Sequence, residues 1–203
     1  MQKFTKKDLE DKIAGQESLT DEEFASQCLR AMLNPHKNWG SGEQLEEFVT
    51  YLEPLRSICD ALPPDRICWL GELFGEAKGD SAVKNIRVII PPRFSVVTWG
   101  GMFKTFVRQC TVAKAKIPAG MVVRCCHGNH GVESLMTLET AGGSRVAVAI
   151  EARSGITTKL DSSTLDHKWQ LTEQATKDLE AFDFIKTILI VISVRHTTDI
   201  LEI

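Results

Sequence analysis

The chain of 203 residues has the length of one large domain or two small ones. Its composition, 43% hydrophobic and 25% charged, excludes a disordered or fibrous chain. The longest apolar run, residues 185–194, is interrupted by Lys186 and is shorter than the ~18 residues of a membrane helix. The amino-terminal residues lack the apolar core of a signal peptide, and the six cysteines are then expected to be free thiols in the cytoplasm.

The charges are unevenly distributed along the chain. Residues 1–80 have a charge balance of −7, and residues 133–203 have a balance of −4. Between them lies the basic segment, residues 81–132, which contains eight basic residues and no acidic one. Such a stretch attracts anions such as phosphates. We expect one compact domain in which an acidic helical region, 1–80, precedes a mainly β region, 81–203.

Helices are predicted throughout residues 1–80. Thr5 is a candidate N-cap, and Thr20 with Glu23 forms the sequence of a capping box. Residues 41–44 repeat this capping pattern ahead of a third helix.

Two boundaries and one surface are predicted within this helical region. Pro54 is expected to begin a new segment, because proline fits the first turn of a helix better than its interior. Residues 67–74 are expected to form the last helix. Four acidic residues are expected on solvated helix exteriors: Glu22, Glu23, Glu46 and Glu47.

The rest of the chain is predicted to be mainly strands. The expected strands are residues 86–90, 94–99, 121–127, 134–140, 145–151, 156–160 and 185–194. Short glycine-containing turns between several of them indicate an antiparallel meander. Helices are expected at residues 102–110, from the spacing of the apolar positions, and at 171–184, with Ser163 or Thr172 as the cap. The predicted fold class is α+β: an N-terminal helical region packed on an antiparallel β-meander with one or two inserted helices.

Residues 185–194 are almost continuously apolar, so both faces of this strand should be covered. We expect a central strand of the sheet, or a strand buried at a contact between two copies of the chain. An exposed edge would favour aggregation.

The basic segment contains the residue types that hold single-stranded nucleic acid, namely cations for the backbone and aromatic rings for the bases. Lys104 and Arg108 are four residues apart and share one face of the predicted helix. The candidate nucleic-acid- or anion-binding residues are Arg93, Lys104, Arg108, Lys114, Lys116, Arg124 and Trp99. In the alternative interpretation the aromatic rings belong to the core, and the cations face solvent or pair with the acidic helices.

Cysteines and histidines gather at residues 124–131. Cys125, His127 and His130 are weak candidate metal ligands, because a tetrahedral zinc site needs four donors and this turn supplies three at most. Cys125 or Cys126 could instead be a nucleophile paired with a histidine. We favour a buried cysteine beside a polar turn, and we expect no metal and no cofactor.

The sequence contains no phosphate-binding glycine loop and no recognisable catalytic motif, so catalysis is the less favoured interpretation. The predicted function is a non-enzymatic accessory or structural protein, similar in design to a viral matrix protein. It is expected to bind single-stranded nucleic acid such as RNA, or another polyanion, and to self-associate. The alternatives are a protein–protein assembly module and, third, a small thiol- or metal-dependent enzyme.

Overall fold

The computed structural model describes residues 5–33, 42–59, 63, 65–74, 81–125, 132–154 and 162–194. Its helices are α1 (Lys6–Glu17), α2 (Asp21–Met32), α3 (Gly42–Ser57), α4 (Leu70–Leu73), α5 (Ser81–Lys84), α6 (Phe103–Ala113), α7 (Ser162–Thr176) and the 3-10 helix η1 (Lys177–Phe182). Its strands are β1 (Ile67–Trp69), β2 (Arg87–Ile89), β3 (Ser95–Thr98), β4 (Met121–Arg124), β5 (Ser134–Thr140), β6 (Arg145–Ser154) and β7 (Phe184–Val194). The predicted α+β class is confirmed.

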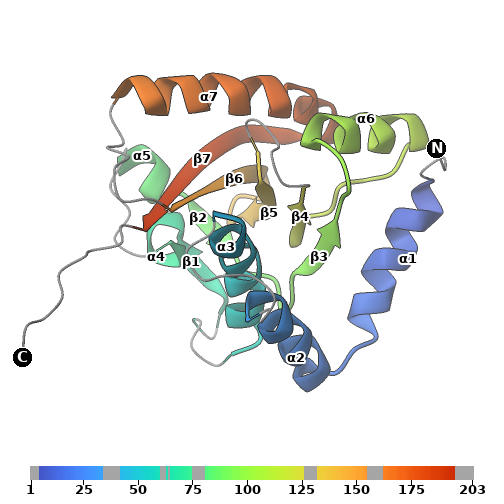
Figure 1. Ribbon diagram of the computed structural model, residues 1–203. Coiled ribbons are helices and arrows are strands. Elements are labelled where there is room, and N and C mark those ends of the chain that lie inside the picture. The colour runs from blue at the N-terminus through green and yellow to red at the C-terminus, as the bar shows by residue number, and fades with distance from the viewer. Residues whose placement is uncertain are drawn as a thin grey trace, which may run out of the picture.

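The strands form one seven-stranded mixed sheet (Figure 1). The expected meander is present where β4, β5 and β6 pair as antiparallel neighbours. β3 pairs with β4 in parallel, and β6 pairs with β7 in parallel. The sheet is therefore mixed instead of wholly antiparallel, because α6 and α7 are long enough to carry the chain back between parallel strands.

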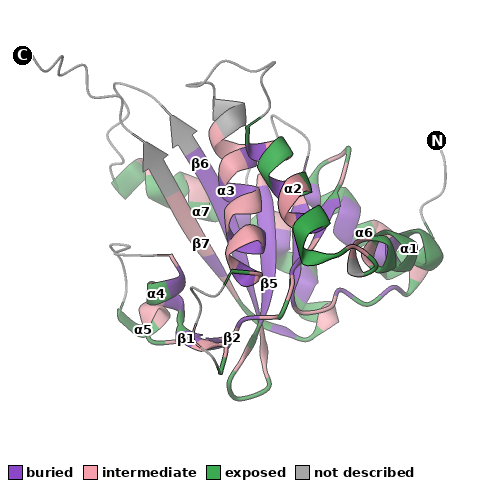
Figure 2. Cartoon of the chain, turned by 90° about the horizontal axis from the view of Figure 1, so that it is seen from below, coloured by how far each residue is buried: buried purple, intermediate pink, exposed green. Residues whose placement is uncertain are grey.

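Two apolar cores lie on opposite faces of this sheet, because side chains alternate along each strand. One core joins Phe24 of α2 and Val49 of α3 to alternate residues of the strands, such as Val148. The other joins Phe103 and Phe106 of α6 to strand residues of opposite parity. Figure 2 shows the buried central strands with α3 across them. Helices therefore cover both faces.

The local helix signals are largely confirmed. Thr5 with Asp8 and Thr20 with Glu23 both form capping boxes. Residue 41 lies outside the described residues. The cap predicted for the last long helix is wrong, since α7 already begins at Ser162.

Two predictions for the helical region are wrong. α3 runs through Pro54 and ends at Ser57, so proline is tolerated one turn before the helix end. Ile67–Trp69 form strand β1 instead of helix, because these residues pair with β2 across the short α4–α5 connection. Tertiary pairing here outweighs the helical spacing of the apolar residues.

Two alternative positions were predicted for the last strand, and the central one is wrong. Among the described residues β7 pairs only with β6, so it lies at an edge of the sheet and not at its centre. The physical reason is the parallel crossover through α7, which returns the chain beyond β6. The second version, burial at a contact between two copies, stays a prediction.

Candidate functional site

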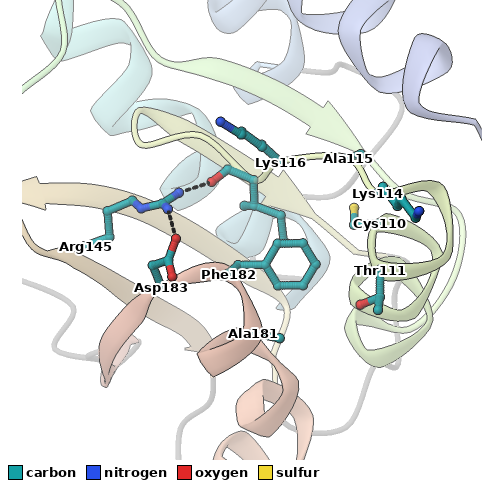
Figure 3. Close-up of a pocket in the computed structure, with 10 residues that line it drawn as sticks. Cys110, Thr111, Lys114, Ala115, Lys116, Arg145, Ala181, Phe182 and Asp183 are labelled. Atoms are coloured by element: carbon teal, nitrogen blue, oxygen red, sulfur yellow. Dashed lines mark hydrogen bonds and ion pairs between the residues drawn. The ribbon is translucent and has the colours of Figure 1, made fainter.

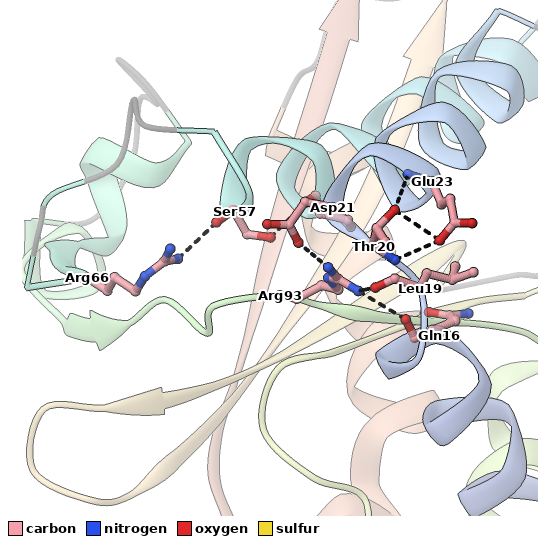
Figure 4. A network of polar contacts seen from close by, with 9 residues as sticks. Gln16, Leu19, Thr20, Asp21, Glu23, Ser57, Arg66 and Arg93 are labelled. Carbon is pink, nitrogen blue, oxygen red and sulfur yellow. Dashed lines mark hydrogen bonds and ion pairs between the residues drawn. The ribbon is translucent and has the colours of Figure 1, made fainter.

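Arg93 is committed to the packing of the amino-terminal helices. Its Nη1 donates hydrogen bonds to the carbonyl oxygens of Gln16 (3.1 Å) and Leu19 (2.7 Å), and its Nη2 forms an ion pair with Asp21 (Figure 4). Its guanidinium also lies 5.1 Å from the centre of the Phe24 ring. These contacts hold α1 and α2 against the sheet and leave Arg93 largely enclosed.

Arg124 is likewise engaged with the acidic region. Its Nη2 lies 3.0 Å from Oε1 of Glu47 on α3, and both side chains are mostly buried. Glu47 itself is only 8% exposed, so its predicted position on a solvated helix exterior is wrong. Glu22 and Glu23 do lie exposed on α2. The eight cations of the basic segment thus do not all converge on one face.

Four of the predicted cations are near one another in the sequence, and their side chains are exposed to solvent. Lys104 and Arg108 lie on the exposed side of α6, opposite its buried side chains, and Lys114 and Lys116 follow the helix. None of the four forms an ion pair with any part of the chain that the structure describes.

A fifth cation lies beside the turn after α6. Arg145 of β6 lines a pocket of about 350 Å³ together with Lys114 and Lys116 (Figure 3). Its guanidinium donates to the carbonyl oxygen of Ile117 (2.9 Å) and pairs with Asp183 (3.0 Å), a carboxylate that is mostly exposed. Sequence analysis missed Arg145 because it lies outside the acid-free segment. We call the four exposed cations without an ion pair among the described residues the basic surface: Lys104, Arg108, Lys114 and Lys116.

Trp99 packs against α6. Its ring meets the Phe106 ring edge-on, with 5.7 Å between the centroids, and its Nε1 donates a hydrogen bond to Oγ1 of Thr105 (3.0 Å). The side chain is half-buried. This geometry favours the alternative in which the aromatic residue belongs to the core.

The cysteine–histidine turn is only partly described. Cys125 is buried, as the favoured interpretation requires, whereas Cys126, His127 and His130 lie outside the described residues. Within the residues that the structure describes, no group of three or more His, Cys, Asp or Glu side chains is arranged to hold a metal ion.

A second charged site lies where β4 and β6 end and β5 begins. The antiparallel register of β5 and β6 ends with Ser134 opposite Ile150, and the next residues beyond this pair are Glu133, which precedes β5, and Glu151 of β6. The Glu133 carboxylate accepts a hydrogen bond from the Ala152 backbone N–H (2.8 Å). At this end of the sheet the Glu151 carboxylate is near enough for its negative charge to act on Glu133.

One cation, Lys168, and one further carboxylate, Glu46, act on this pair. Lys168 of α7 forms an ion pair with Glu151, which is only 2% exposed. The pKa of Glu133 is raised to about 8, first by burial and then by the negative charges of Glu46 and Glu151, against the opposing effects of the Ala152 hydrogen bond and of Lys168. We call Glu133, Glu151 and Lys168 the carboxylate site.

Sequence analysis missed the carboxylate site. Its acidic members are isolated in the sequence, and their proximity depends on the pairing of β5 with β6. One signal was present: Glu151 directly follows the apolar run 146–150 of a strand, where a charged residue needs a partner. Lys168 of α7 is the partner that this buried carboxylate has in the fold.

Among the described residues, none of the helices combines the length and apolar character that crossing a membrane would require. Comparison of the chain with protein-family models, with curated proteins and with solved structures gives no match.

Proposed function

We propose that the protein binds nucleic acid through the basic surface, with Lys104, Arg108, Lys114 and Lys116 contacting backbone phosphates. The observation that supports this most directly is that these four side chains are exposed and form no ion pair within the described chain. Exposed cations that have no ion-pair partner among the described residues attract a polyanion, and each phosphate they contact releases condensed counterions.

Salt dependence tests this proposal. Fluorescence anisotropy with single-stranded RNA and DNA should show binding. The logarithm of the association constant should fall linearly with the logarithm of the salt concentration, with a slope of about −0.7 per phosphate contact. The double replacement Lys104→Ala/Arg108→Ala should make that slope shallower by roughly 1.4. The matched control is Lys7→Ala/Arg30→Ala, which removes two exposed cations from α1 and α2.

Two results would contradict the proposal. One is the absence of any association with either nucleic acid at low salt. The other is a salt slope that the α6 double replacement leaves unchanged, which would place the binding elsewhere on the molecule.

A second candidate function, metal-dependent hydrolysis of a phosphate ester, is favoured by the carboxylate site. Glu133 lies directly before β5 and next to the β6 residues around Glu151, and it is half-buried whereas Glu151 is fully buried. Mg²⁺ typically binds to one or two carboxylates, several waters and the phosphate of a substrate.

The chemistry that such a site would support is the hydrolysis of a phosphodiester. The oxygen of a water molecule forms a bond to phosphorus, the bond from phosphorus to one ester oxygen breaks, and that oxygen takes up a proton. A divalent cation on Glu133 and Glu151 would lower the pKa of the attacking water and stabilise the charge on the phosphoryl oxygens. Lys168, at the Glu151 end of the pair, would supply a further positive charge.

Metal binding and cleavage test this second function separately from the first. Calorimetric titration with Mg²⁺ should show binding that Glu133→Gln and Glu151→Gln each weaken, and single-stranded RNA or DNA should be cleaved in Mg²⁺ and not in EDTA. Glu139→Gln is the matched control, since Glu139 is an exposed carboxylate of β5. Binding of nucleic acid with neither Mg²⁺ affinity nor cleavage would overturn the hydrolase function and leave the first proposal standing.

A further inference from the structure

The outer edge of β7 is the starting observation. β7 pairs with β6 along ten aligned residue pairs, from Arg145 opposite Phe184 to Ser154 opposite Val194. Within the part of the chain that the structure describes, no other strand pairs with it. A long edge strand presents a row of backbone N–H and C=O groups that a further strand can pair with.

Several apolar side chains are exposed beside this edge. Ile185 is 68% exposed, and Leu165 and Trp169 on α7 are each 39% exposed. Between α7, η1 and the beginning of β7 lies a groove of about 620 Å³, lined by both Trp169 and Ile185. Exposed apolar side chains that gather at one groove are typical of an interaction site.

The charges of this groove point to a second copy of the chain as its occupant. A two-fold contact uses the same patch on both subunits, so that patch must be complementary to itself. The groove is lined by two carboxylates, Glu173 and Glu180, and by two cations, Lys177 and Lys186. A patch with equal numbers of both signs can place its acids against the bases of an identical patch.

The sequence of β7 is also compatible with pairing to itself. Lys186 is the only charged residue between Phe184 and Val194. In an antiparallel pair centred on Leu189, the middle residue of the strand, Lys186 lies opposite Ile192 of the other copy. Lys186 therefore does not lie opposite Lys186 of the other copy, and the repulsion between like charges that would destabilise the pairing is avoided.

We propose that the protein forms a two-fold dimer in which β7 pairs antiparallel with β7 of a second copy, so that the two sheets become one. Ile185 and Trp169 lie in the contact, and the α7 helices approach each other on one face of the joined sheet. This inference is independent of the nucleic-acid and hydrolase proposals, since it uses none of their residues.

The oligomeric state of the intact chain is the first test. Sedimentation equilibrium should give a dimer, and Ile185→Lys should raise its dissociation constant by at least about tenfold, because it places a charge in the contact. Val112→Lys is the matched control, since Val112 is 63% exposed on α6. A monomer at every soluble concentration, or a dimer that Ile185→Lys leaves unchanged, would overturn the proposal.

Hydrogen exchange locates the contact. The amides of residues 184–194 should become more protected as the protein concentration rises across the dissociation constant, while the amides of β3 should not change. Part of the protection of β7 comes from its pairing with β6, so the result that would contradict the dimer is a protection of β7 that does not rise with concentration. The protection of the Ile185→Lys variant should match that of the dilute wild-type protein.

Discussion

Arg124 and Glu47 form an ion pair of 3.0 Å that joins the basic segment to the acidic helical region. The pair connects the last residue of β4 to α3, and Glu47 is only 8% exposed. One of the cations expected to meet phosphate thus has a protein carboxylate as its partner. The charge asymmetry of the sequence is partly neutralised inside the fold.

Replacement of Arg124 by alanine should therefore destabilise the protein. Removing one member of a largely buried ion pair leaves the other charge without its compensation, and the expected loss in the free energy of unfolding is roughly 3 kcal/mol. Urea unfolding measures it. Arg108→Ala, an exposed cation of α6, should change stability by less than about 0.5 kcal/mol. Equal effects of the two replacements would show that the ion pair contributes nothing.

Trp99→Ala should lower the melting temperature and leave the nucleic-acid affinity of the folded protein nearly unchanged. The ring packs on Phe106 and donates to Thr105, and fully buried tryptophans cost about 3–5 kcal/mol when replaced by alanine. A half-buried ring should cost about 2–3 kcal/mol. Trp99→Phe, which keeps a ring and loses the Nε1–H donor, should cost less.

Binding of single-stranded RNA by the folded Trp99→Ala variant separates the two roles of this ring. If Trp99 stacked on a base, affinity would fall by about 1–3 kcal/mol with little change in the salt slope. The structural role leads us to expect an affinity close to that of the wild-type protein below the melting temperature.

The local signals were the part of this fold that the sequence predicted well. The capping box of Thr20 and Glu23 and the apolar spacing of α6 involve residues within one or two helical turns, so their geometry is already implied by the order of the residues. Predictions were wrong where contacts between distant segments determine the secondary structure. Ile67–Trp69 became a strand because β2 lies beside it, and no local pattern reveals that neighbour.

The same distinction explains the candidate sites. Lys104 and Arg108 share a helix face, and their common exposure followed from their spacing. Glu133 and Glu151 are 18 residues apart and meet only through the register of β5 and β6. A site that depends on pairing between strands could therefore not be predicted from the sequence, whereas a site on one helix could.

In EDTA, the stability of the protein should decrease as the pH rises from about 5 to 8. The pKa of Glu133 is about 8 in the folded chain against an ordinary value of 4.5, because of burial and the charges of Glu46 and Glu151, with Lys168 acting in the opposite sense. The folded protein thus retains a proton that the unfolded chain has already lost. Each unit of pKa difference corresponds to about 1.4 kcal/mol as an upper bound.

Glu133→Gln should remove this part of the pH dependence and be more stable than the wild-type protein at pH 8. Urea unfolding at a series of pH values measures both effects. Glu139→Gln, which changes an exposed carboxylate on the same strand, should preserve the wild-type profile. A Glu133→Gln profile parallel to that of the wild-type protein would mean that Glu133 does not titrate in this range.

Gly120→Ala should destabilise the connection between α6 and β4. Gly120 has a φ of +80°, and a Cβ atom there would lie 3.1 Å from Cβ and 3.2 Å from Cγ of Pro91. Its N–H donates to the Thr137 carbonyl oxygen (2.7 Å), and its carbonyl oxygen accepts from the Ser95 N–H (2.8 Å), so the residue holds three strands in place. The left-handed conformation costs a non-glycine residue about 1–2 kcal/mol, and the contact with Pro91 adds to that cost.

Gly143→Ala provides the matched control for this replacement. Gly143 has the same φ of +80°, but no heavy atom lies within 4 Å of the position where its Cβ would stand. Its replacement should therefore cost about 1–2 kcal/mol from the backbone conformation alone. The difference in urea-unfolding free energy between the two variants isolates the effect of packing against Pro91. If Gly120→Ala costs no more than Gly143→Ala, the turn can move away from Pro91 without loss, and the strands do not depend on this close approach.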